Sequence, residues 1–154
     1  MKYLVSILLA IAIETISPAY AQEAASTAVG RTEAAMKIID QARLACSLEK
    51  GKFKTEPEAV IKLDLNGDGK IDEILDEGKF ACSTAASLYC GTGGCGLHLI
   101  VNGKNHNYLS LVWSLANLGD SKIILMGVHW SECKYKTPCI RAVVWRDGKF
   151  RYLR

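Results

Sequence analysis

Six cysteines constrain the fold of this chain more than any other feature of its sequence. An even set of cysteines in an exported protein predicts disulfides, here three of them. The sequence does not choose among the possible pairings, but short separations favour two local loops and leave the remaining two cysteines for each other. Zinc is the alternative, yet the close pairs lack the usual two-residue spacing of zinc ligands. The favoured pairs are Cys90 with Cys95, Cys133 with Cys139, and Cys46 with Cys82.

The first 21 residues have the pattern of a cleaved signal peptide. A short basic start precedes an apolar run over residues 4–13, and small residues at positions 19 and 21 suit signal peptidase. A membrane anchor is the competing interpretation, but it needs about 20 apolar residues and Glu14 interrupts this run. We therefore expect a periplasmic or secreted protein, with no membrane span in the mature chain.

An amphipathic helix is predicted over residues 32–50. The preceding residues 22–31 are rich in alanine, serine and threonine without apolar periodicity, which indicates a flexible arm. From Thr32 onward, apolar residues recur at helical spacing, and Gly51 lies where the helix is expected to stop. We interpret the apolar stripe as a core-packing face. Its members are Ala35, Ile38, Ile39, Ala42, Ala45 and Cys46.

The rest of the chain reads as short strands separated by turn signals. Asn102-Gly103, Gly119-Asp120 and Asp147-Gly148 mark three of the turns. This spacing predicts an antiparallel β-meander, and the helix would cover its apolar face. The fold class is therefore α+β, with residues 32–154 as a single disulfide-bonded domain. The predicted strands are residues 60–63, 71–75, 97–101, 108–113, 122–130, 140–145 and 149–153.

The stretch 64–72 carries the clearest chemistry. Oxygen-bearing side chains occupy alternate positions, and two glycines allow the backbone to turn tightly. Hard oxygen ligands wound into a short loop suit Ca²⁺ better than Mg²⁺, which demands near-octahedral geometry. The alternative is a pair of turns with no metal. The candidate ligands are Asp64, Asn66, Asp68, the Lys70 carbonyl and Asp72.

This loop resembles the first nine positions of an EF-hand loop, but Leu75 stands where the EF-hand has its bidentate glutamate. The nine-residue form is similar to the calcium loops of FG-GAP (integrin-type) repeats and, more loosely, of dockerins. The resemblance covers only residues 62–76. It implies calcium ligation by the five residues named above. Without the twelfth-position carboxylate, we expect weak binding, in the range of about 10⁻⁴–10⁻³ M.

No catalytic motif accompanies this loop. Residues 91–96 match the glycine spacing of dinucleotide-binding turns, but a strand-like segment follows them where that motif needs a helix. The three histidines His98, His106 and His129 lie in or beside unrelated strands, and no nucleophile can be paired with any of them from sequence. The tryptophans at positions 113, 130 and 145 are expected to pack in the core or cover the sheet.

Charge divides the chain into two parts. Residues 22–80 carry 9 basic and 12 acidic side chains, whereas residues 122–154 carry 8 basic and 2 acidic ones. The carboxy-terminal part is therefore suited to an anionic partner, although a solvated basic edge is the simpler interpretation. Export argues against nucleic acid as a partner.

We predict a non-enzymatic calcium-binding domain that contacts an envelope or extracellular macromolecule. The alternatives are an inhibitor of a secreted enzyme and a small histidine-dependent hydrolase.

Overall fold

Helix α2 (Glu33–Leu48) opens the part of the chain that the computed structural model describes, which comprises residues 30–133 and 139–153. The Thr32 hydroxyl accepts a hydrogen bond from the Ala35 amide and caps the helix. The predicted helix 32–50 is confirmed to within two residues at its end. The predicted signal peptide and most of the predicted arm lie outside the described residues.

The end of α2 differs in detail from the prediction. Lys50, not Gly51, takes the left-handed conformation that stops the helix, with φ of 57°. Gly51 instead allows the backbone to pass close to the Cys46–Cys82 disulfide. A Cβ atom at this position would lie 2.3 Å from the Cys82 sulfur and 2.8 Å from the Cys46 sulfur.

Eleven strands follow within the described residues, all paired antiparallel. A small sheet joins β1 to β4; the inner sheet has the order β2-β3-β6-β5, with β7 also paired to β6; and the outer sheet has the order β11-β10-β9-β8. The strands are β1 (Phe53–Thr55), β2 (Val60–Leu63), β3 (Asp72–Asp76), β4 (Phe80–Cys82), β5 (Cys90–Gly91), β6 (Gly94–Val101), β7 (Lys104–Ser110), β8 (Val112–Leu118), β9 (Ser121–Val128), β10 (Cys139–Arg146) and β11 (Lys149–Tyr152). Short 3₁₀ turns η1 (Pro57–Ala59), η2 (Glu77–Lys79) and η3 (Trp130–Glu132) connect some of them.

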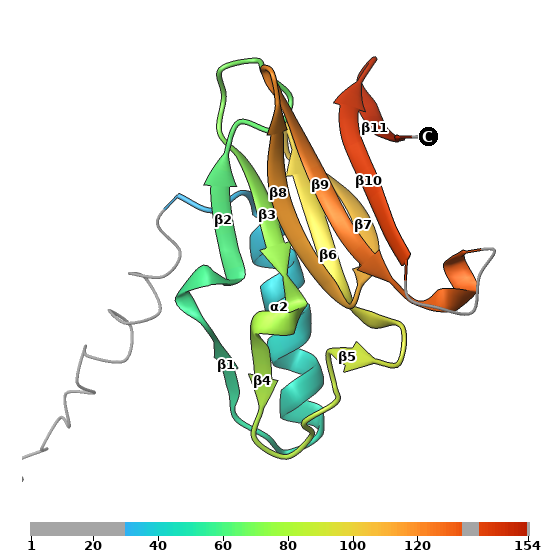
Figure 1. Cartoon of the computed structure of the whole chain (residues 1–154). Helices are drawn as coiled ribbons and strands as arrows, with labels where there is room; N and C mark the ends of the chain where they lie inside the picture. Colours follow the sequence, from blue (N-terminus) through green and yellow to red (C-terminus); the bar gives the residue numbers. More distant parts are fainter. Residues whose placement is uncertain (1–29, 134–138, 154) are drawn as a thin grey trace, which may run out of the picture. The chain divides into compact units, whose positions relative to one another are not determined.

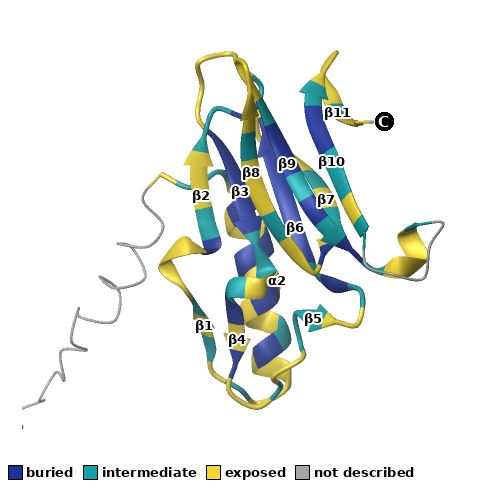
Figure 2. Ribbon diagram, viewed as in Figure 1, coloured by how far each residue is buried: buried dark blue, intermediate teal, exposed yellow. Residues whose placement is uncertain are grey.

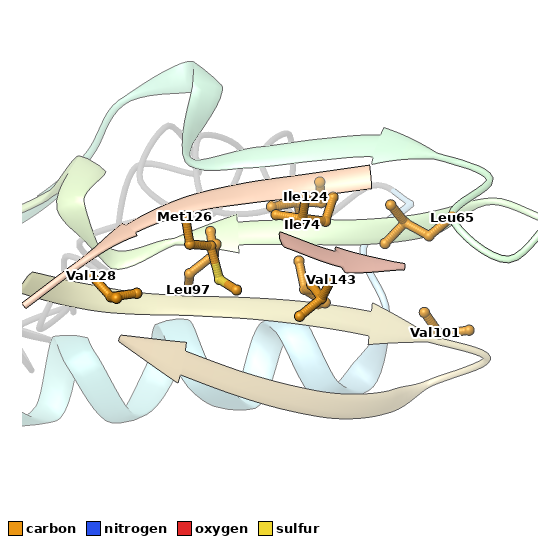
Figure 3. Packing of buried hydrophobic residues seen from close by; sticks show 9 residues of the cluster. Leu65, Ile74, Leu97, Val101, Ile124, Met126, Val128 and Val143 are labelled. Atoms are coloured by element: carbon orange, nitrogen blue, oxygen red, sulfur yellow. The ribbon is translucent and has the colours of Figure 1, made fainter. Parts of the chain in front are cut away.

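These elements form three layers: the helix, the inner sheet and the outer sheet (Figure 1). Leu97 of β6 faces the outer sheet, where it packs with Ile124 and Met126 (Figure 3). Leu99 belongs to the same cluster. Ile100, on the opposite face of β6, packs against α2. Burial on both faces makes β3 and β6 the most buried strands (Figure 2). The α+β class is confirmed, but the single meander that the sequence predicted is two stacked sheets.

The sheets separate at Leu111, inside the strand predicted over residues 108–113. Strand β7 ends at Ser110 and β8 begins at Val112. The Leu111 amide donates to the Gly127 carbonyl at 2.8 Å, and the Ser110 hydroxyl donates to the Val112 carbonyl at 2.7 Å. The chain therefore passes from the inner to the outer sheet without a glycine or proline to mark the break, which is why the sequence did not reveal β8.

Three disulfides join the pairs that proximity favoured. Cys46–Cys82 ties the end of α2 to β4, Cys90–Cys95 closes the turn between β5 and β6, and Cys133–Cys139 links the segment after η3 to β10. No thiolate is left to hold zinc, because all six cysteines are paired. None of the helices in the described ranges is long and apolar enough to cross a membrane.

Candidate functional site

The loop between β2 and β3 is wound around the carboxylate of Asp64. Gly67 and Gly69 both have positive φ, near 80°, and fold the backbone back on itself. Asp64 Oδ1 accepts from the Asn66 amide (3.2 Å) and the Gly67 amide (2.6 Å), and Oδ2 accepts from the Gly69 amide (2.8 Å). These hydrogen bonds, above all that from Gly69, lower the pKa of the Asp64 carboxyl.

Asp68 occupies the exposed side of the same loop. Its Oδ1 accepts from the Lys70 amide at 2.9 Å, and its Oδ2 accepts from the Asn66 side-chain amide at 2.9 Å. The hydrogen bond from Asn66 is the largest cause of the lowered pKa of Asp68. Both Asp64 and Asp68 are therefore held ionised, as a cation site requires.

Asp72 lies on the buried side of the loop, with 1% of its surface exposed. One carboxylate oxygen accepts from the Leu65 amide and the other from the Asn102 amide, both at 3.0 Å. Asn102 belongs to the β6–β7 turn, and its side chain also reaches Asp68 Oδ2 at 3.2 Å. The loop is thus anchored to a turn about 30 residues away. The sequence identified Asn102 only as a turn residue, because nothing local reveals this contact.

The structure brings the four predicted ligand side chains into one hydrogen-bonded network, which Lys70 joins through its backbone amide. Backbone amides donate hydrogen bonds to the carboxylates of this network. Across residues 30–133 and 139–153, no three histidine, cysteine, aspartate or glutamate side chains converge closely enough to hold a metal ion. Calcium binding by this loop therefore stays a prediction.

His98 is buried on the helix side of the inner sheet and has partners at both ring nitrogens. Its Nε2 lies 3.1 Å from Glu77 Oε1, and its Nδ1 lies 3.0 Å from the Asn105 side-chain nitrogen. Because the amide nitrogen can only donate, Nδ1 accepts and Nε2 carries the proton given to Glu77. Gly96 leaves room for this contact, since a Cβ there would lie 2.5 Å from Glu77 Oε2. Neither nitrogen is free to act as a general base.

The other two histidines lie elsewhere. His129 caps η3, with Nδ1 2.8 Å from the Ser131 hydroxyl. His106 lies between the sheets, with its ring centroid 5.6 Å from that of Trp145 and 5.3 Å from that of Phe150, and its Nε2 is buried with no hydrogen-bond partner. The described residues therefore do not gather the histidines into one site.

His106 predicts a pH dependence of stability. Burial, with a smaller contribution from Lys104, lowers the pKa of His106 below its usual 6.5. The unfolded chain then binds a proton more readily than the folded chain, so the free energy of unfolding falls as the pH falls through 6.5 toward the folded-state pKa. Urea unfolding at pH 8 and pH 5 measures the difference, and His106→Gln is expected to reduce it. An unchanged difference in the variant would assign the pH dependence to other groups.

The tryptophans and the basic residues also scatter over the fold. Trp145 packs with Phe150 at a centroid distance of 5.0 Å, as expected for a core residue, whereas Trp130 is half exposed. Arg141 pairs with Glu132 at 3.1 Å, and Arg151 lies 3.9 Å from Asp147. Part of the basic carboxy-terminal charge is thus neutralised within the chain. Lys134, Lys136 and Arg154 lie outside the described residues.

An open cleft of about 440 Å³ lies where η1, β2 and η2 approach the start of β8. Asp76 is fixed inside it by the Gly78 amide and the Trp113 indole nitrogen, each 2.8 Å away. No activated nucleophile lines the cleft, because the Ser110 hydroxyl is bonded to a carbonyl and Cys95 is in a disulfide. Sequence reasoning missed this cleft. Its lining residues are Glu58, Ile61, Asp76, Gly78, Lys79, Cys95, Ser110, Leu111, Val112 and Trp113.

Fold and site together define a disulfide-bonded α+β protein with a carboxylate-rich loop at one connection and an open, mixed-polarity cleft beside an edge strand. Comparison with models of protein families, with curated proteins and with solved structures finds no match to this chain.

Proposed function

We propose that this protein is an exported, non-enzymatic binding domain in which Ca²⁺ bound weakly at residues 64–72 stabilises the β2–β3 connection. The observation that carries the proposal is the winding of the loop around Asp64, with Gly67 and Gly69 in the left-handed region. This winding leaves the Asp68 carboxylate exposed, with Asp64 and Asn66 half-buried beside it, so a cation could reach Asp68 from solvent.

The existing hydrogen bonds are compatible with a bound cation. A carboxylate offers about four lone-pair positions, and the Asp64 and Asp68 carboxylates each accept three hydrogen bonds. Asp68 Oδ1 accepts only one of these, so it retains a free lone pair for a hard cation. Calcium bound here would fix the contact from this loop to Asn102, and so couple the ion to the packing of β2 and β3 against β6 and β7.

Two features support binding rather than catalysis. Both nitrogens of His98 are occupied, and the cleft beside β8 contains carboxylates without a nucleophile. Three disulfides are typical of domains that fold in an oxidising compartment and present a rigid surface there. The partner is an envelope or extracellular macromolecule.

Capture from envelope extract tests this role. The protein immobilised with excess Ca²⁺ is expected to retain a partner that elutes with chelator and is not retained by Asp68→Asn. Recovery of an enzyme whose activity falls on binding would favour the inhibitor alternative. No retained partner in either condition would contradict a binding domain.

A further inference from the structure

Strand β8 has an unpaired backbone edge. It is the terminal strand of the outer sheet and pairs only with β9 among the described strands. No described strand pairs with its other side. Such an edge is a ready template for an added segment of polypeptide.

This edge lacks the devices that prevent strand addition. Residues 112–118 contain no charged residue and no proline. By contrast, β11, at the opposite edge of the outer sheet, carries Lys149 and Arg151, and β2, at an edge of the inner sheet, is four residues long and carries Lys62. Among these edges, β8 is the one left open to pairing.

The surface beside β8 is apolar. Val112 and Leu118 are 68% and 62% exposed, and Ile140 of β10, which like Val112 lies opposite Gly127 of β9, is 74% exposed on the same side of the sheet. A shallow hollow of about 130 Å³ lies beside Val112 and Ile140, and its lining residues are Val112, Trp113, Ser114, Leu125, Gly127 and Ile140. Alternate side chains of an added strand would lie over this face, so we expect apolar residues there.

The opposite face of an added strand would meet the cleft at the start of β8. Glu58 and Asp76 supply carboxylates there, and Trp113 supplies an indole ring. The cleft also contains Lys79, but its ammonium group is paired with Glu56 at 2.9 Å. Carboxylates beside an aromatic ring suit a lysine or arginine side chain, through ion pairing and cation–π attraction.

A second copy of this chain fits the edge less well. In an antiparallel pair of β8 strands centred on Leu115, Val112 would face Leu118 of the other copy. The turn after Leu118 would then place Asp120 beside the cleft that contains Glu58 and Asp76. Like charges at that point oppose pairing, whereas a basic residue in the added strand favours it.

We propose that β8 binds an extended segment of a partner polypeptide by strand addition, with apolar side chains on the outer face and one lysine or arginine in the cleft. The inference rests on the proposed role as a binding domain and gives that role a partner chemistry. Main-chain hydrogen bonds to β8 provide affinity, and the cleft selects the basic side chain.

A synthetic peptide in which valine and threonine alternate around one central lysine tests the proposal. Its affinity for the full protein is measured by anisotropy of a fluorescent label. N-methylation at one set of alternate positions is expected to abolish binding, whereas N-methylation at the intervening set leaves the affinity within about twofold, because only alternate amides face β8. Equal effects of the two sets would overturn strand addition.

The preference for a basic side chain is tested by changing one residue in the protein and one in the peptide. Glu58→Gln is expected to weaken binding of the lysine peptide about fivefold and to leave a norleucine peptide unaffected, since an exposed ion pair contributes up to about 1 kcal/mol. Equal weakening of both peptides contradicts a basic residue in the cleft.

If no peptide binds but envelope extract still yields a partner, strand addition is wrong and the binding role stands. Dimerisation of the free protein through β8 would also overturn the proposal.

Discussion

Replacement of both Cys46 and Cys82 by alanine is expected to lower the free energy of unfolding by roughly 4 kcal/mol. The bond closes a loop with a sequence separation of 36 residues, so its loss releases considerable entropy in the unfolded chain. It also joins α2 to β4 at two buried positions, where truncation leaves a cavity. Urea unfolding of the double variant measures the loss.

The matched control is the double replacement of Cys90 and Cys95. Their sequence separation is only 5 residues, so the same chain-entropy relation predicts a loss of roughly 2 kcal/mol. A larger loss for this short loop than for the long one would show that entropy of the unfolded chain does not set the stabilisation.

Glu73→Gln is expected to cost about 2 kcal/mol. Glu73 is 1% exposed, and its carboxylate accepts hydrogen bonds from the Thr32 amide, at 3.1 and 3.0 Å, and from the Thr32 hydroxyl. The charge also lies at the positive amino-terminal end of α2. The glutamine side chain carries no charge, and its NH₂ group would face the two donors of Thr32. Hydrogen bonds to charged groups contribute about 1.5–3 kcal/mol. Urea unfolding provides the measurement.

Glu33→Gln serves as the control for this prediction. Glu33 lies in the first turn of the same helix but is exposed. Its replacement is expected to cost less than about 1 kcal/mol, because a solvated charge near a helix end contributes little. Equal losses at the two positions would mean that burial and the contacts to Thr32 are not what makes Glu73 important.

Features set by neighbouring residues could be predicted from sequence. The spacing of Ile38, Ile39 and Ala42 identified the helix and its buried face, and Asn102-Gly103 identified the β6–β7 turn. Proximity in sequence identified the disulfide pairs, because two of them close short loops. The α+β class followed from these local patterns.

Features that depend on long-range packing were missed. Glu73 is charged and directly follows Asp72, so its sequence resembles an exposed strand position, but β3 is covered on both faces and Thr32, at the start of the helix, supplies the donors to Glu73. Leu111 lies in a strand-like stretch without glycine or proline, so the sequence did not reveal the passage between the sheets. The cleft combines Glu58, Asp76 and Trp113, which become neighbours only when the two sheets stack.

The candidate loop was located from sequence, but its hydrogen bonding was not. The alternation of Asp64, Asn66 and Asp68 predicted a tight turn rich in oxygen atoms, and the structure has one. The contacts of Asp72 and Asp68 with Asn102 come from a distant turn. These two contacts give Asp68 and Asp72 a structural role that does not require a metal.

Calorimetric titration of the protein with calcium chloride tests the central proposal most directly. Asp68→Asn is the decisive comparison, because asparagine retains an oxygen to accept from the Lys70 amide but lacks the carboxylate charge. We expect the parent to bind one Ca²⁺ with a dissociation constant of about 10⁻⁴–10⁻³ M and the variant to bind at least tenfold more weakly. Identical titrations for the two proteins, or no binding heat from the parent at about 10 mM calcium, would contradict a calcium site at residues 64–72.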